Sequence, residues 1–213
     1  MPTETENLIQ NMAREAGDRQ ATNDLSAGQA LLAATALALA VAMVMVTVVI
    51  GVRPDLMNLM QNGSPLFKLA STLLLACGGF IVAKHTMQPD APTLHLIALL
   101  PGVVLLAAGA AMDHSGLSVL GASNISVPAC VGAILMLSIP AFVLVLRALR
   151  TGAPTRPNIA GAAAGFLSGA LGAAAYALAC KNDGELFVAV WYGAAILMMT
   201  GLGAVIGRRA LVW

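Results

Sequence analysis

Three cysteines are the residues of this chain best suited to chemistry: Cys77, Cys130 and Cys180. None lies in a Cys-X-X-Cys pair, and no cysteine spacing matches a structural zinc site. Two thiols brought together could form a disulfide or bind a soft metal ion as thiolates. What these cysteines can do therefore depends on the elements that position them.

Those elements are long apolar runs. Of the 213 residues, 59% are hydrophobic and 10% are charged, whereas a globular domain carries roughly a quarter charged residues. Lipid needs no polar covering, and about 20 helical residues cross its hydrocarbon core. The sequence therefore predicts an all-α integral membrane protein with six transmembrane helices, at 29–52, 66–83, 94–112, 127–147, 158–180 and 186–207.

Lysine and arginine near the helix ends predict the orientation, because cytoplasmic loops are enriched in both. With six helices, both termini lie on one side of the membrane. That side would hold Arg14, Arg19, Lys84, Arg147, Arg150, Arg156, Arg208 and Arg209. The other side would hold only Arg53 and Lys181, with Lys68 inside the second helix, from where it could snorkel to the interface. Both termini are therefore predicted to be cytoplasmic.

Counting along the fourth and fifth runs places two cysteines at similar depth. Cys130 and Cys180 each lie about 20–24 residues from the link near 147–157, which is roughly 30–35 Å at helical rise. Both should therefore lie near the outer membrane face on two helices joined as a hairpin. This arrangement permits a disulfide, and it equally permits two small buried residues that only pack. Cys77 lies deeper in the second run, where packing is expected.

Small residues recur every four positions along the fifth run, at Gly161, Gly165 and Gly169. Such a stripe lets two helix backbones approach closely, either within one chain or between two copies. Cys180 continues near this face and would be held against a neighbouring helix. At the start of the sixth run, Trp191 and Tyr192 are typical of aromatic residues that anchor a helix at the membrane interface.

Other chemistry finds little support. No charged residue lies in the middle of the last four runs, whereas an ion pathway usually contains one. The histidines lack the spacing of a metal site, and no set of residues indicates an enzyme or a cofactor. No cluster of basic residues could neutralise several phosphates, so nucleic acid is not expected as a partner.

The first 27 residues are polar and form a separate N-terminal tail. Thr3 and Glu6 have capping-box spacing, and the apolar side chains of Leu8, Ile9 and Met12 recur at helical spacing. A helix this short is marginal in water, but a groove on a partner protein could stabilise it. A disordered leader is the alternative. Residues 17–27 are expected to form a linker.

Several short motifs carry a family resemblance across nearly the whole chain. Arg53-Pro54-Asp55-Leu56 follows the first run, and Lys68 follows Phe67 at the start of the second. Cys130 begins the fourth run, and Cys180 precedes an acidic loop and a Trp-Tyr pair. With Asn7-Leu8-Ile9 in the tail, the chain resembles the NrsF-like family of six-helix bacterial membrane anti-sigma factors. It lacks the proline expected soon after the second cysteine.

The resemblance implies a non-enzymatic regulator in the bacterial inner membrane. Its cytoplasmic tail would bind an extracytoplasmic-function sigma factor, with Leu8, Ile9 and Met12 as the contact residues. Envelope, oxidative or metal stress sensed near Cys130 and Cys180 would release that partner. Two other functions stay open from the residues. One is a small transporter or channel, which would need a polar path. The other is a membrane thiol oxidoreductase, which two outward cysteines allow.

Overall fold

The computed structural model describes residues 4–54, 64–88, 93–113, 116, 118–121, 127–152 and 154–211. Within these ranges the regular secondary structure is entirely helical. The elements are α1 (Glu4–Met45), η1 (Val46–Ile50), α3 (Ser64–Thr86), η3 (Thr93–Leu99), α4 (Leu100–Ala111), α5 (Val127–Leu149), α6 (Pro157–Tyr176), α7 (Glu185–Phe187), η4 (Val188–Tyr192) and α8 (Gly193–Ala210).

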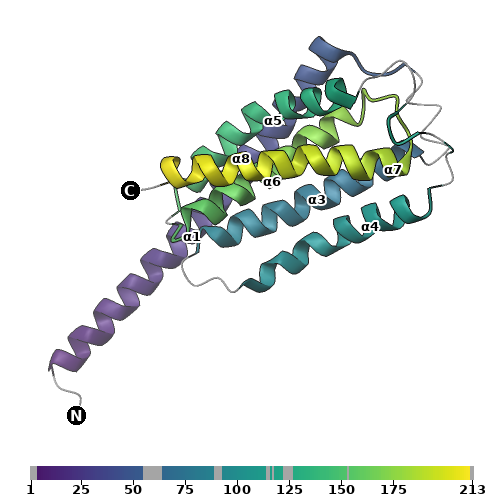
Figure 1. Ribbon diagram of the computed structural model, residues 1–213. Helices are drawn as coiled ribbons and strands as arrows, with labels where there is room; N and C mark the ends of the chain where they lie inside the picture. Colours follow the sequence, from purple (N-terminus) through teal and green to yellow (C-terminus); the bar gives the residue numbers. More distant parts are fainter. Residues whose placement is uncertain are drawn as a thin grey trace.

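The helices lie side by side in a bundle, with the two ends of the chain at the same end of it (Figure 1). Five of them are long and apolar enough to cross a membrane: Ser26–Ile50, Leu66–Thr86, Val127–Leu149, Pro157–Tyr176 and Glu185–Ala210. Leu96–Ala111 is a shorter apolar helix. The predicted all-helical class with apolar helices is confirmed, and the third predicted helix proves the shortest.

The helix boundaries differ from the predicted ones in two places. The fifth predicted helix ends at Tyr176 rather than at residue 180, so Cys180 lies in the link that follows α6. The predicted third helix begins as a 3₁₀ helix and becomes α-helical only at Leu100, with Pro101 in its first turn. Proline has no N–H to donate, and the first turn of an α-helix is where that lack costs least.

The linker predicted at 17–27 is wrong, because α1 continues through it as one helix from Glu4 to Met45. The segment contains Gly17 and several polar residues but no proline. One glycine costs a helix only about 1 kcal/mol, and the polar residues cost less. The long apolar part of α1 can therefore propagate its helix backwards through this segment. As a result, the tail and the first span form one continuous element.

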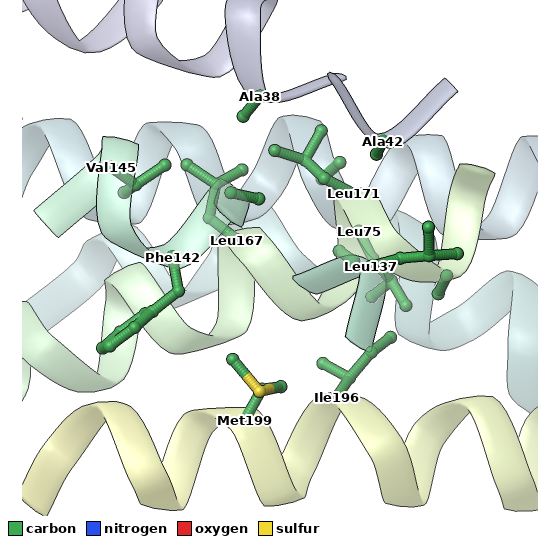
Figure 2. Packing of buried hydrophobic residues seen from close by; sticks show 14 of the residues in the cluster. Ala38, Ala42, Leu75, Leu137, Phe142, Val145, Leu167, Leu171, Ile196 and Met199 are labelled. Carbon is green, nitrogen blue, oxygen red and sulfur yellow. The ribbon is translucent and has the colours of Figure 1, made fainter. Parts of the chain in front are cut away.

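Helix α6 runs through the middle of the bundle and contacts α8, α5, α3 and α1. Its span is 83% buried, more than any other candidate span. Figure 2 shows Leu167 and Leu171 of this helix among apolar side chains of α1, α5 and α8. The core is therefore built around α6, the helix that leads into Cys180.

The predicted glycine stripe packs α6 against α8 within one chain. A Cβ atom added at Gly161 would collide with the carbonyl oxygen of Gly203, and one added at Gly165 would collide with that of Met199. Gly169 lies against Ile196 in the same way, with slightly more room. The stripe therefore faces α8 rather than α5, so it does not itself hold Cys180 against the helix of Cys130.

Replacing Gly165 by alanine is expected to destabilise the bundle by about 1–3 kcal/mol, because a backbone carbonyl blocks the added methyl group and the helices must separate. The matched control is Gly201→Ala on α8, where an added Cβ meets no atom within 4 Å. Thermal unfolding in detergent would compare the two variants with the parent. Equal melting temperatures for both variants would contradict the close α6–α8 contact.

Candidate functional site

Cys130 and Cys180 lie side by side in the interior of the protein. Cys130 is in the first turns of α5, and Cys180 follows α6 in the link at 177–184. The amide of Cys180 still donates to the carbonyl of Tyr176, 3.0 Å away, so the thiol sits directly beyond the helix end. Both cysteines are free thiols with essentially no exposed surface, and their side chains are close enough for Cys130 to shift the pKa of Cys180.

Two tyrosines enclose the thiol pair. The hydroxyl of Tyr176 donates to the sulfur of Cys130 at 3.4 Å. The ring of Tyr192 lies 6.2 Å from that of Tyr176, measured between centroids, and Tyr192 is fully buried. The prediction that Tyr192 is an interfacial anchor is therefore wrong. Trp191 is half-buried, and its indole N–H donates to the carbonyl of Val119 at 2.8 Å.

A buried ion-pair cluster holds the link that carries Cys180. The ammonium of Lys68, on α3, lies 2.7 Å from Oδ1 of Asp183. It also donates to the carbonyl oxygens of Cys180 at 3.1 Å and Asn182 at 2.7 Å. Nη1 of Arg53 lies 2.9 Å from the same Asp183 oxygen and 3.2 Å from the Cys180 carbonyl oxygen. Both cations therefore bind the same four-residue segment, 180–183.

Lys68 does not snorkel, which corrects the sequence expectation. It is completely buried, and burying an ammonium is costly unless it is paired and hydrogen-bonded. Its three N–H donors match three oxygen atoms: the carbonyls of Cys180 and Asn182 and the carboxylate of Asp183. The oxygen atoms of residues 180, 182 and 183 thus surround the Lys68 ammonium and stabilise its buried charge.

Sequence reasoning missed Asp183, Asn182 and Tyr176 as members of this site. A usable signal existed, because a lysine inside an apolar run calls for an anionic partner. Asp183 stands three residues after Cys180 in one of the few polar links. Lys68 and Asp183 are 115 positions apart in the sequence, so only the folded bundle shows that they pair.

The surroundings of Cys180 favour its thiolate. Hydrogen bonding from the Cys130 thiol lowers the pKa of Cys180 to about 6, and the Lys68 ammonium adds to this effect, while burial opposes it. A thiolate is the nucleophilic form of cysteine and the form that binds metals. At neutral pH, Cys180 would therefore be the attacking sulfur and Cys130 the thiol beside it.

Replacing Lys68 by methionine is expected to raise the pKa of Cys180, because a nearby positive charge is removed. The parent should react more slowly with hydrogen peroxide as the pH falls through about 6. In the variant this decline should begin at a higher pH, and the rate at neutral pH should fall several-fold. Rates of Cys180 oxidation measured against pH in a Cys77→Ser background would test this.

Lys84→Met is the matched control, because Lys84 is an exposed lysine at the opposite end of the same helix. Its pH profile should follow that of the parent. A melting curve of each variant would show whether the fold is retained. Superimposable pH profiles for all three proteins would contradict a role for Lys68 in activating Cys180.

The other predicted residues lie away from the thiol pair. Cys77 is exposed on α3. Ile9 and Met12 are 61% and 62% exposed on α1. Pro54 is exposed beside Arg53, while Asp55 and the side chain of Leu8 fall outside the described residues. Across the described part of the chain, no group of three or more His, Cys, Asp or Glu side chains is placed to hold a metal ion.

Comparison with known proteins shows the family of the chain. The family described as "NrsF: Negative regulator of sigma F" matches residues 16–213. The "Probable anti-sigma-F factor NrsF" of Azospira oryzae is 34% identical, over 98% of this chain and 99% of that protein. The "Anti-sigma-F factor NrsF" of Caulobacter vibrioides is 42% identical over 84 residues, 39% of each chain. No solved structure matches. The chain therefore belongs to the NrsF family of negative regulators of sigma F.

Proposed function

We propose that this protein is an inner-membrane anti-sigma factor that holds an extracytoplasmic-function sigma factor through the N-terminal part of α1. Reaction of the Cys130–Cys180 pair under stress would release that partner. The observation that carries the proposal is α1 itself. The exposed side chains of Ile9 and Met12 lie near the N-terminal end of this helix, and the same helix continues into the bundle (Figure 1).

Insertion in a membrane is supported by the surface of the bundle. Large apolar side chains are exposed along its helices, including Leu32, Val48, Val104, Leu197 and Val205. Such a surface suits lipid better than water. The last turns of α3, α5 and α8 carry Lys84, Arg147, Arg208 and Arg209. These basic ends lie at the same end as both termini (Figure 1), which supports a cytoplasmic N-terminus.

The proposed sigma-binding surface lies near the N-terminal end of α1. Ile9 and Met12 are three positions apart and therefore share one face of the helix. Among the residues of α1 whose burial is described, the first buried one is Ala27, about 27 Å beyond Ile9 at helical rise. Apolar side chains that far from the bundle would be in water, and a groove on a partner would bury them. Both residues precede the range that the family match covers.

The sensing step follows from the thiol pair. The Cys180 thiolate and the Cys130 thiol would form an S–S bond and lose two electrons to hydrogen peroxide. The peroxide O–O bond breaks, and its two oxygens leave as water after taking up the Cys130 thiol proton and one proton from solvent. A soft metal ion such as Cu(I) would instead bind both sulfurs as thiolates and displace the proton of Cys130. Either change removes the proton that the Cys130 thiol shares with Cys180, and it alters the sulfur that accepts the hydrogen bond of Tyr176.

Purification of the tagged full-length chain from its native membranes would test the proposal. A sigma factor of the extracytoplasmic-function class should co-purify and be identified by mass spectrometry. Treatment with peroxide or Cu(I) should then release it. A chain that carries no sigma factor in untreated cells would contradict the proposal. Steady turnover of a thiol substrate would instead support an oxidoreductase.

A further inference from the structure

We infer that Arg53 and Asp183 couple the thiol pair to α1, and so carry the state of Cys130 and Cys180 to the sigma-binding end of that helix. This inference rests on the proposed function and adds the path by which a change at one end of the bundle reaches the other. Arg53 belongs to the chain segment that directly continues α1, whereas Asp183 belongs to the link of Cys180. Their contact joins the two.

The chain leaves α1 in a way that brings Arg53 onto this link. Helix α1 passes into η1, and Gly51 then turns the chain with φ +85°, a conformation that other residues rarely adopt. The amide of Arg53 donates to the carbonyl of Leu178 at 3.3 Å. Its Nη1 reaches both carboxylate oxygens of Asp183, at 2.9 and 3.1 Å. The outer end of α1 is thus attached through both backbone and side chain.

Cys180 takes part both in the thiol pair and in the contact with Arg53. Its sulfur adjoins Cys130, and its carbonyl oxygen accepts hydrogen bonds from Arg53 and Lys68. An S–S bond is about 2.0 Å long, much shorter than any contact between unbonded sulfurs. Disulfide formation must therefore draw the two sulfurs together, and because Cys130 is held within α5, the link that carries Cys180 takes up the movement. The carbonyl carbon of Cys180 is only three bonds from its sulfur. This movement therefore disturbs the hydrogen bond between the Cys180 carbonyl oxygen and Arg53.

Helix α1 is suited to pass on such a movement. It is a single helix from Glu4 to Met45, so a shift at its outer end appears at its free end as a translation or rotation. Its span is only 17% buried, the least of the five candidate spans. Ala38 and Ala42 are among its buried contacts with the core (Figure 2). Leu31 is also fully buried, but because so little of the span lies against the core, the Arg53 contact contributes to the position of α1.

In the reduced state, then, Arg53 holds α1 in the position that retains the sigma factor, and loss of this contact releases it. The test uses the full-length protein in lipid nanodiscs with its sigma factor bound. Arg53→Gln and Asp183→Asn remove one charge each from the contact. Arg53→Lys keeps the charge. Lys181→Gln is the matched control, because Lys181 is an exposed cation in the same link.

Two quantities are measured in each sample: the sigma affinity before and after peroxide, and the Cys130–Cys180 disulfide by thiol trapping and mass. Oxidation should weaken the parent's affinity on the order of tenfold, within the usual range of coupling between sites. Arg53→Gln and Asp183→Asn should bind weakly even when reduced, and oxidation should change little although the disulfide still forms. Arg53→Lys and Lys181→Gln should behave like the parent.

The coupling would be overturned if Arg53→Gln and Asp183→Asn, like the parent, released the sigma factor only after oxidation. The proposed function would then remain intact. A parent that neither binds nor releases a sigma factor would instead overturn the proposed function. A disulfide that still forms shows that α5 and α6 remain assembled in the variants.

Hydrogen exchange of the parent, measured without a sigma factor, gives a second readout that needs no variant. The peptide covering residues 46–54 contains the Arg53 amide bonded to Leu178. Oxidation should accelerate its exchange, because the attachment loosens. Exchange that is unchanged by disulfide formation would overturn the inference.

Discussion

A chain with Cys130→Ser and Cys180→Ser is expected to keep its sigma factor bound under a peroxide dose that releases it from the parent. The reason is chemical, because serine can form neither a disulfide nor a thiolate–metal bond. The affinity of the double variant for its sigma factor should not change measurably on oxidation. The affinity of the parent should fall on the order of tenfold. Co-purification from treated membranes and expression of a sigma-dependent reporter would measure it.

The structure supplies a matched control for this result. Cys77→Ser removes the third thiol, which is exposed on α3 and lies apart from the other two. This variant should respond like the parent. Single replacements at Cys130 or Cys180 should each abolish the response to peroxide, because one sulfur cannot form the internal bond. A double variant that still releases its sigma factor on oxidation would disprove sensing by the thiol pair.

Ile9→Glu combined with Met12→Glu is expected to free the sigma factor even without stress. Burying each apolar side chain at an interface contributes roughly 1.5–3 kcal/mol. Losing both, and placing two carboxylates in an apolar groove, should weaken binding at least 100-fold. Co-purification with the sigma factor should fail, and the sigma-dependent reporter should be expressed constitutively.

Gln10→Glu is the control for the added charge. Gln10 is exposed on the same turn of α1 but about 100° around the helix from Ile9. If α1 binds through the face of Ile9 and Met12, Gln10→Glu should retain most of the binding. The double variant should still form the Cys130–Cys180 disulfide, because its substitutions lie far from the bundle. Undiminished co-purification of Ile9→Glu/Met12→Glu would rule out this face.

The helical class could be predicted from the sequence because its apolar runs are long and do not alternate with polar residues. Runs of about 20 apolar residues separated by polar links indicate helices whatever their tertiary neighbours. The same counting placed Cys130 and Cys180 at one depth, and the structure brings them together as free, buried thiols. Their chemistry stays a prediction. Boundaries were less secure, as the early end of α6 shows, because the last turn depends on local contacts.

The sequence failed where a residue's role depends on a distant partner. Tyr192 has the composition and position of an interfacial anchor, but it packs beside Tyr176 in the core. The segment 17–27 is polar enough for a linker, but the apolar part of α1 extends its helix through it. In both cases tertiary packing or helix propagation outweighed a local preference.

By itself, then, the sequence determined the helical class, because that class follows from the length and composition of the apolar runs, and it predicted matching heights for Cys130 and Cys180. Only the tertiary structure decided what surrounds the thiols. Lys68 and Asp183 stand far apart in sequence, and burial of the ammonium is stabilised only where the link folds its oxygens around it. The same fold sets Arg53 on that link, and so attaches α1 to the segment that carries Cys180.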